Sequence, residues 1–282
     1  MKKKYLCWTL VCLLALLVGW TAWGNTHLEQ NTYVISSAQL PPAFSGFRIA
    51  HVSDLHNAQM GQGNEKLLSM LEKMQPDMIA ITGDLIDSRK TDMGVALDFV
   101  SEAVKIAPCY YVPGNHEARI AQYEEFKGKM VATGVTVLEN TQTQITRGND
   151  TITVTGMKDP SFETDYLLGD AEAVINAQLE VLAVAEDTYR ILLSHRPELF
   201  ACYTAHAVDL ALSGHAHGGQ FRLPLIGGLF APNQGLFPQY DAGVFAEGRT
   251  RMVVSRGIGN SAFPFRFANP PEVLLIELKT DL

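Results

Sequence analysis

The residues of this chain that could perform chemistry are histidines, carboxylates and one asparagine in five short motifs. The motifs are Asp54-Leu55-His56, Gly83-Asp84-Leu85-Ile86-Asp87, Gly114-Asn115-His116-Glu117, Ser194-His195 and Gly214-His215-Ala216-His217. They contain five of the eight histidines, and each motif follows an apolar segment. Imidazole, carboxylate and amide-oxygen ligands without a thiolate suit Mn, Fe or Zn. The motifs therefore predict a site for divalent metal ions.

Each motif alone also has an ordinary structural interpretation. Asp-x-His fits a helix cap beside a surface histidine, Gly-Asp-x-x-Asp fits a turn, and Gly-Asn-His-Glu fits a capped strand-to-helix turn. His215 and His217 are more specific, because residues i and i+2 of an extended segment point to the same side. Five such motifs, each after an apolar strand, favour one shared cluster over chance placement.

Strands that end at these motifs must bring them together. Asp54 and Asp84 are 30 residues apart, and Asp84 and Asn115 are 31 apart, so each interval fits one βα crossover. The carboxyl ends of strands in an open α/β sheet converge on one crevice. For the first half we expect strands at 47–52, 78–81 and 109–112 and helices at 64–74 and 95–106, which predicts a parallel sheet.

The second half departs from this alternation. Gly148-Asn149-Asp150 between residues 143–147 and 151–157 is a hairpin signal. Beyond it we expect a helix at 172–184 and strands at 190–193, 210–212, 252–254 and 273–278. Residues 214–259 hold 10 of the 23 glycines, which predicts a stretch dominated by loops. The sum is a mixed α/β body whose two halves supply strands to one core.

In this order the five motifs resemble those of the calcineurin-like metallophosphoesterase superfamily, over residues 54–217. The tail motifs Val254-Ser255-Arg256-Gly257-Ile258-Gly259 and Pro271-Glu272-Val273 resemble its bacterial membrane-associated branch, which includes a cell-envelope phosphodiesterase and a UDP-2,3-diacylglucosamine pyrophosphatase. The resemblance implies an α/β fold of two mixed β-sheets packed face to face and flanked by helices, a four-layer αββα sandwich. It also implies a metal-dependent hydrolase of phosphoric esters or pyrophosphates.

The resemblance further implies seven metal ligands and one catalytic residue, His116. The ligands are Asp54, His56 and His217 for one ion, Asn115, His195 and His215 for the other, and Asp84 as the bridge. Two divalent ions about 3.5–4 Å apart polarise a phosphoryl oxygen and generate a hydroxide that attacks phosphorus. Manganese is the expected metal, with iron or zinc as alternatives. His116 would act as an acid or transition-state donor, a role that suits a group titrating near neutrality.

Several neighbouring residues have two interpretations. Asp87 fits a partner of a ligand imidazole or a helix cap, and Glu117 fits the first turn of a helix. Three arginines could clamp a phosphate or form ordinary salt bridges: Arg196, Arg256 and Arg266.

The N-terminal segment is a candidate membrane anchor. From Tyr5 to Trp23 only two threonines and one glycine interrupt the apolar run, which is long enough to cross a bilayer. The three lysines before it favour a cytoplasmic N-terminus and an exported body. Ala22-Trp23-Gly24 also fits a signal-peptide cleavage site, in which case the body would be secreted. We therefore expect an anchor or signal peptide at 1–24, a linker with one short strand near 33–35 at 25–46, and a catalytic domain at 47–282.

The charge balance bears on the partners. The chain has 22 basic and 30 acidic residues, a net charge of −8. After residue 24 the balance is 19 against 30, or −11, with no basic tract. A sequence-independent nucleic-acid binder needs a basic surface, so a nucleic-acid partner is disfavoured. Cys109 and Cys202, the two cysteines of the body, fit reduced core residues or a single disulfide.

The apolar stretches 223–230 and 263–267 bear on the substrate. They fit ordinary packing beneath a long loop, or a lipid-facing lip beside the site. The lip would favour a lipid-linked phosphodiester or pyrophosphate such as UDP-diacylglucosamine. Alternative functions are a phosphodiesterase or nuclease acting on soluble nucleotides or nucleic acid, and a non-catalytic metal-binding scaffold, which normally lacks some of these ligands.

Overall fold

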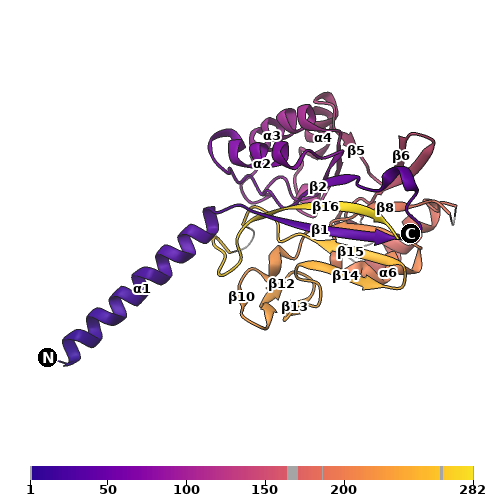
Figure 1. The fold of residues 1–282 in the computed structure, drawn as a ribbon. Helices are drawn as coiled ribbons and strands as arrows, with labels where there is room; N and C mark the ends of the chain where they lie inside the picture. Colours follow the sequence, from indigo (N-terminus) through magenta and orange to yellow (C-terminus); the bar gives the residue numbers. More distant parts are fainter. Residues whose placement is uncertain (1, 164–170, 186, 261–262, 282) are drawn as a thin grey trace.

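Two six-stranded sheets pack face to face in the computed structural model, which describes residues 2–163, 171–185, 187–260 and 263–281. Helices cover both outer faces, and one long helix projects from the body (Figure 1). The mixed α/β, four-layer architecture expected from the sequence is confirmed. The α-helices of the described residues are α1 (Lys2–Thr26), α2 (Glu65–Met74), α3 (Met93–Ile106), α4 (Tyr123–Ala132), α5 (Ala171–Val181) and α6 (Phe200–Ala205).

The first sheet carries the βα units of the N-terminal half. Its strands lie in the order β1 (Glu29–Ser37), β16 (Glu272–Thr280), β2 (Arg48–Val52), β3 (Met78–Thr82), β4 (Cys109–Val112) and β5 (Thr136–Val137). From β2 to β5 the strands run parallel, whereas β16 runs antiparallel to β2. The parallel strands place the loops that follow β2, β3 and β4 at one edge of the sheet.

Amphipathic helices cover the outer face of this sheet. On α2, Leu67, Leu71 and Met74 recur at helical spacing and are buried, as the pattern predicts. The first turn of α3 is capped by Asp92, whose carboxylate accepts a hydrogen bond from the backbone N–H of Gly94 (3.0 Å). Each fully buried aliphatic side chain of this layer contributes about 1.5–3 kcal/mol.

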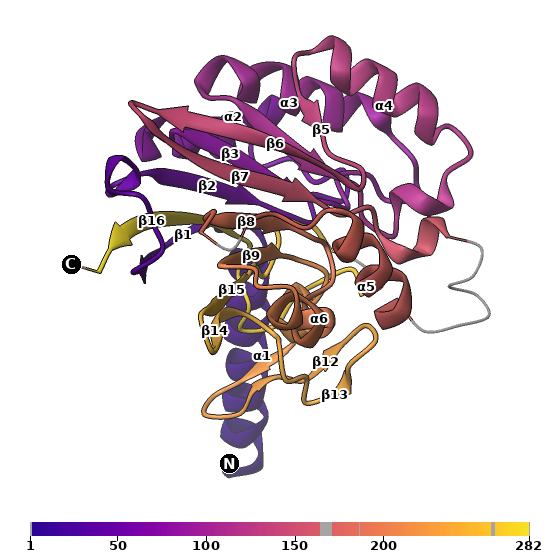
Figure 2. The same ribbon diagram turned by 90° about the vertical axis from the view of Figure 1, so that its right-hand side faces the viewer.

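The second sheet comes from the other half of the chain. Its order is β14 (Gly243–Glu247), β15 (Thr250–Val254), β9 (Leu210–Ser213), β8 (Arg190–Leu193), β7 (Asp150–Gly156) and β6 (Thr141–Arg147). β7, β8, β9 and β15 run parallel. β6 and β7 form the hairpin predicted around residues 148–150. α5 and α6 pack on the outer face (Figure 2).

Apolar residues from both sheets form the central core. Ile49 and Ile276 of the first sheet pack in one cluster with Ile191 and Leu212 of the second. Two further clusters lie between each sheet and its helices. Cys109 and Cys202 are buried free thiols in these two separate outer clusters, as the reduced alternative requires.

Two parts of the fold differ from the expectation. The segment 25–46 contains a nine-residue strand, β1, which pairs with β16 in parallel along its whole length, so it is part of the first sheet. Backbone pairing there outweighs the polar side chains. The sequence also did not indicate α4, α6, β5 or β14. Loops do dominate after β9, with the short pairs β10 (Arg222–Leu223) with β11 (Gly227–Gly228) and β12 (Phe230–Ala231) with β13 (Gly235–Leu236).

Candidate metal centre

Five loops, each at the carboxyl end of a strand, meet where the two sheets come together. Three follow β2, β3 and β4 of the first sheet, and two follow β8 and β9 of the second. All eight predicted site residues lie in these loops and are buried: Asp54, His56, Asp84, Asn115, His116, His195, His215 and His217. The arrangement brings together residues up to 163 positions apart in the sequence.

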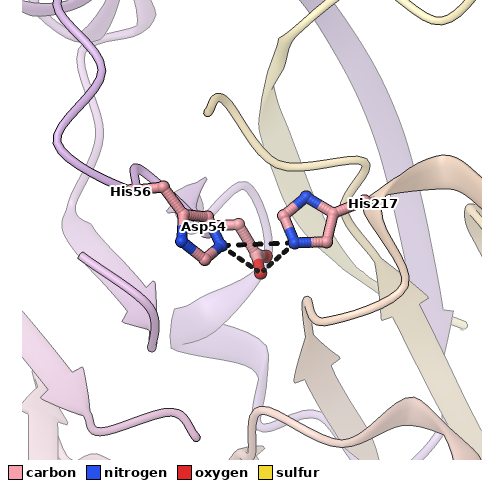
Figure 3. Close-up of side chains that lie close together, drawn as sticks. All are labelled: Asp54, His56 and His217. Atoms are coloured by element: carbon pink, nitrogen blue, oxygen red, sulfur yellow. Dashed lines mark hydrogen bonds and ion pairs between the residues drawn. The ribbon is translucent and has the colours of Figure 1, made fainter. Parts of the chain in front are cut away.

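The first cluster joins the loop after β2 to the loop after β9 (Figure 3). His56 Nε2 lies 3.2 Å from His217 Nε2. Both nitrogens face Asp54 Oδ1, at 3.8 Å for His56 and 3.4 Å for His217. Three ligand atoms around one point form a geometry that could hold a divalent ion. Burial lowers the pKa of His217 to about 3, so this ring is neutral and keeps a lone pair for a metal.

The second cluster joins the loops after β3, β8 and β9. His195 Nε2 lies 3.2 Å from Asp84 Oδ2 and 3.1 Å from His215 Nδ1. The Nδ1–H of His195 donates to the carbonyl of Thr82 (2.7 Å), which directs Nε2 toward the carboxylate. Burial alone would lower the pKa of His195, but the Asp84 carboxylate outweighs it and raises the pKa to about 10. A metal ion binding here would displace that proton.

Asp84 belongs to both clusters through a single oxygen. Its Oδ2 lies 3.2 Å from His195 Nε2 and 3.6 Å from His56 Nε2. Its other oxygen, Oδ1, accepts a hydrogen bond from the backbone N–H of His116 (2.8 Å), which fixes the carboxylate. The two clusters thus share one carboxylate oxygen, which is the arrangement that a bridging ligand requires.

Asn115 supplies an independent test of the fit to a metal. Its side chain is buried, and its Oδ1 accepts no hydrogen bond from the part of the chain that the structure describes. A buried amide oxygen without a partner costs free energy. A cation at this position would satisfy it. The unpartnered oxygen and the mixed imidazole–carboxylate set therefore fit a divalent ion.

Backbone strain is concentrated on the predicted ligands. Five of the seven have a positive φ between 45° and 65°: Asp54, His56, Asp84, His215 and His217. Residues with a Cβ rarely adopt this left-handed conformation, and such outliers gather at functional sites. Nothing in the sequence indicated this strain, because the identity of an aspartate or a histidine does not reveal the sign of its φ.

His116 lies beside the first cluster, and its tautomer is fixed by the backbone. The N–H of Ser88 donates to Nδ1 (3.0 Å), so the ring proton is carried by Nε2. Burial lowers the pKa of His116 to about 4, and the ring is neutral at pH 7. Asp87 Oδ1 lies 3.5 Å from Nδ1 and also accepts from the backbone N–H of Arg89 (2.9 Å), so Asp87 orders this loop.

Glu117 is a site residue whose role the sequence did not reveal. It is fully buried, and its carboxylate accepts backbone N–H bonds from Asp84 (2.8 Å), Ile86 (3.0 Å) and Gly114 (2.7 Å). Burial raises the pKa of Glu117 to about 7, and the Asp84 carboxylate also raises it, against the three hydrogen bonds. The first-turn interpretation hid this role, because two of the donors lie in another loop about 30 residues earlier.

Two of the three arginines considered from sequence form ion pairs. Arg196 donates Nε–H and Nη2–H to the two oxygens of Asp159 (2.6 and 3.0 Å). Arg256 pairs with Glu29 (2.9 Å) and Glu272 (2.7 Å). The salt-bridge alternative therefore describes both. The Arg196–Asp159 pair is buried, whereas Arg256 is partly buried and joins the buried Glu272 to the partly exposed Glu29.

The cavity at the metal centre is lined by other arginines. Arg266 donates to the carbonyls of Arg256 (2.7 Å) and Gly259 (2.5 Å) and does not line the cavity. The cavity has a volume of about 280 Å³, and its walls include Arg89 and Arg119. Both follow motifs that the sequence singled out, two residues after Asp87 and three after His116. Their closeness to these motifs in the sequence could have indicated both arginines as cavity residues.

Comparisons with known proteins agree with this geometry. The model of the calcineurin-like phosphoesterase family matches residues 47–219, which is more than half of the chain. An uncharacterized metallophosphoesterase of Bacillus subtilis, YkuE, is 29% identical over 93% of this chain and 90% of its own. The phosphodiesterase YaeI of Escherichia coli is 28% identical over 82% of each chain.

Solved structures share the fold. The crystal structure of TT1561 of Thermus thermophilus superposes with a TM-score of 0.52, at 16% sequence identity. The match covers 76% of this chain and 91% of that one. At this identity the likeness concerns the fold alone.

Proposed function

The chain belongs to the calcineurin-like phosphoesterase family, and we propose that it is a phosphodiesterase or pyrophosphatase that uses two divalent metal ions. The observation that carries the proposal is the position of Asp84 Oδ2, 3.2 Å from His195 Nε2 and 3.6 Å from His56 Nε2. One oxygen within reach of both clusters is what two adjacent ions need in order to share a ligand.

Each ion would have its own set of protein ligands. Asp54, His56 and His217 would hold one ion, whereas Asn115, His195 and His215 would hold the other. When bound, the ions would supply a nucleophile from water and neutralise the charge of the phosphoryl oxygens. The donor set suits manganese, with iron or zinc as alternatives.

His116 would donate a hydrogen bond to the reacting phosphate. Burial lowers the pKa of His116 to about 4, so the neutral ring suits the expected transition-state donor and not an acid that titrates near neutrality. The Ser88 N–H occupies Nδ1, which leaves the Nε2–H as the donor. Arg119 lines the same cavity and is suited to bind the non-bridging oxygens, because guanidinium groups pair with phosphate bidentately. Arg89 lines the cavity too, and its Nε–H and Nη2–H donate to the Asp87 carboxylate (2.9 and 2.8 Å), which positions its guanidinium at the wall. Together these three side chains would orient the phosphorus toward the metals.

A lipid-linked substrate is the narrower part of the proposal. Asn233 lines the cavity, and it lies in a stretch with no charged residue, 223–240. An apolar border beside a phosphate site suits a substrate whose leaving group or acyl chain is apolar. A soluble nucleotide or nucleic acid is the alternative, and the −11 balance after residue 24 disfavours a nucleic acid.

We also propose that α1 stays attached and anchors the body outside the cytoplasm. Within Lys4–Thr26, an 18-residue window has a mean hydropathy of 2.0 and no buried residue, and this is the only helix of the described residues long and apolar enough to span a membrane. The far end of α1 contacts the body: Asn25 exchanges two hydrogen bonds with the backbone of Arg266 (2.7 and 2.8 Å). Cleavage after Gly24 would leave Asn25 on the body and remove the rest of α1. The intact mass of the membrane-extracted protein tests this, and we expect the mass of the full chain.

The test of function is a substrate screen with the manganese-loaded full chain in detergent. We expect hydrolysis of bis-p-nitrophenyl phosphate, and faster hydrolysis of a lipid pyrophosphate than of soluble nucleotides. His116→Ala should lower kcat by about 10²–10³-fold, the usual cost of removing one hydrogen-bond donor to the charge of a transition state, with metal content nearly unchanged. Lys129→Ala, at an exposed position of α4, is the matched control. Loss of metal together with activity in His116→Ala would make His116 a ligand, and a folded, metal-loaded chain inactive on every phosphoester and pyrophosphate would exclude the enzyme.

A further inference from the structure

An exposed apolar surface lies next to the membrane helix. Residues 223–240 contain no Asp, Glu, Lys or Arg, in a chain where 18% of residues are charged. Most of its large apolar side chains are well exposed, with fractions of 107% for Leu225, 60% for Ile226, 68% for Leu236 and 59% for Phe237. Ordinary packing beneath a loop is therefore excluded for these residues. Apolar patches of this kind mark interaction surfaces.

The neighbouring loop adds to this surface. Phe263 and Phe265 are 45% and 46% exposed. Both rings lie 5.4 Å from Phe221, the residue just before β10, so the two loops are in contact. We call residues 223–240 together with Phe263 and Phe265 the apolar face.

The apolar face is on the side of the body from which α1 leaves. Figures 1 and 2 both show β12 and β13 on the lower side of the body, the side toward which α1 projects, with α2, α3 and α4 on the upper side. Trp20 of α1 packs edge-to-face on Phe267, at 5.4 Å between ring centroids. The direction of α1 relative to the face is therefore set by side-chain contacts as well as by the chain.

A cavity connects α1 with the apolar face. It has a volume of about 730 Å³. One wall is formed by Leu17, Val18 and Ala22 of α1, and the other by Phe265 and its neighbours. Its lining is mainly apolar, so it is suited to a hydrocarbon chain and not to a phosphate.

We propose that the apolar face rests in the same leaflet of the bilayer that α1 enters from the body, and that its partner is the lipid surface itself. A spanning helix fixes the membrane plane at its end, and the face continues directly from that end. Because the face is uncharged, burial of apolar side chains and not attraction to anionic headgroups would hold it there.

The same hairpin would connect the bilayer to the metal centre. Pro232 and Asn233, between β12 and β13, line the metal cavity, and Asn233 Oδ1 lies 3.0 Å from His215 Nε2. Leu236 and Phe237 follow on the exposed side. A phosphoester at the lipid surface would thus be within reach of the site, a consequence that rests on the proposed function, whereas the docking itself does not.

The test places an environment-sensitive fluorophore on the face of the full chain in nanodiscs of uncharged lipid. Cys7 and Cys12 are replaced by Ser, and Leu225→Cys or Leu236→Cys is labelled with NBD. The matched control is Val131→Cys, an exposed apolar position (55%) on α4 at the opposite end. We expect a blue shift and quenching by nitroxide-labelled lipid several-fold stronger at 225 and 236 than at 131, with protection from aqueous iodide.

Two outcomes would overturn the proposal. Equal lipid quenching at 225, 236 and 131 would place the face in water. A blue shift that appears in crowded vesicles and disappears in nanodiscs holding one chain would assign the face to a second copy. Leu225→Asp provides a second test. Leu225 is fully exposed, so a charge at this position should leave the fold intact while opposing insertion into lipid. It should return the NBD at position 236 toward water.

Discussion

At the scale of single residues, two carboxylates set the geometry of the site from opposite sides. Asp84 Oδ2 faces the ligand rings of both clusters. Glu117 lies behind it and holds the backbone of Asp84 and Gly114 in place. The first residue would bind metal, and the second is a positioning residue that acts through the loops. Substitution of Asp84 would remove a metal ligand, whereas substitution of Glu117 would leave all ligands in place but shift their loops.

Replacement of Glu117 by Gln should weaken metal binding. The amide keeps the shape of the side chain but offers an N–H₂ group where backbone N–H groups need acceptors, so the Asp84 loop must shift. Loss of such supporting hydrogen bonds typically lowers metal affinity by about 10–100-fold. Titration of the metal-free variant with manganese measures this change.

Glu125→Gln, at an exposed position of α4, is the matched control and should bind manganese as the parent does. Excess manganese should restore turnover in Glu117→Gln, because the ligands themselves are intact. Unchanged affinity in a folded variant would refute the positioning role.

The difference between these two carboxylates shows what residue types can predict. Asp84 directly follows a strand and belongs to a motif that resembles those of the family. Its role as a metal ligand could therefore be predicted from the sequence. Glu117 could not, because its role depends on three donors brought to it by packing of separate loops. The arginines show the same limit: Arg196 and Arg256 pair with the buried carboxylates of Asp159 and Glu272, while Arg119 and the Asp87-paired Arg89 line the cavity.

At the scale of elements, the loops approach one another so closely that glycine is required. A Cβ on Gly214 would overlap Ser53 Oγ and Asp54 Oδ2. A Cβ on Gly114 would overlap Asp84 Oδ1 in the same way. The loops therefore contact one another through glycine backbone atoms without an intervening side chain. This close contact lets ligands from both sheets converge.

Gly214→Ala should displace Asp54 and lower kcat/KM by about 10²-fold or more, since displacements near 1 Å have such effects. Turnover and bound manganese are measured together, and both should fall. Gly128→Ala, in α4 with open space around its Cβ, should be fully active and more stable by up to about 1 kcal/mol. Normal metal content in Gly214→Ala would contradict the close packing of these loops.

Acid should weaken the connection between the loops after β7 and β8. Burial alone would raise the pKa of Asp159, but the Arg196 guanidinium outweighs it and lowers the pKa to about 2. Because the folded pKa lies below the ordinary value of 3.8, this pair stabilises the fold above about pH 4, and its contribution is lost as pH falls toward 2. Thermal unfolding between pH 2 and 7 measures the loss.

Asp159→Asn should remove this part of the pH dependence and destabilise the fold by about 3 kcal/mol at pH 7, as expected when a buried pair loses one partner. Glu125→Gln, in an exposed pair with Lys129, should change stability by less than about 1 kcal/mol. An acid transition of the same size in Asp159→Asn would show that other carboxylates are responsible.

The elements that position the site were predictable where apolar periodicity was strong. The strands before every ligand motif are present, because each is a short apolar run followed by polar residues. α4 was not predicted, although Tyr123, Phe126 and Met130 recur at helical spacing, because Gly128 and four charged residues lie among them. β1 was predicted too short, since most of its residues are polar and only Ile35 is buried, so its extent depends on backbone pairing with β16.

At the scale of the whole molecule, charge and apolarity are separated in space. The net charge of −8 divides into three lysines at the membrane end and −11 beyond residue 24. Two divalent ions would add about four positive charges within the acidic body, which makes a locally cationic cavity for phosphate. The uncharged stretch 223–240 borders that cavity on the side of α1. This arrangement favours a phosphoester presented at a membrane.

The most direct test of a shared two-metal site is turnover of bis-p-nitrophenyl phosphate against bound manganese per chain, as manganese is added to the metal-free full chain. Asp84 lies between both clusters, and the proposed mechanism uses both ions, so turnover should remain low up to one bound ion and rise with the second. Full turnover at one ion per chain, or none at two, would contradict the account.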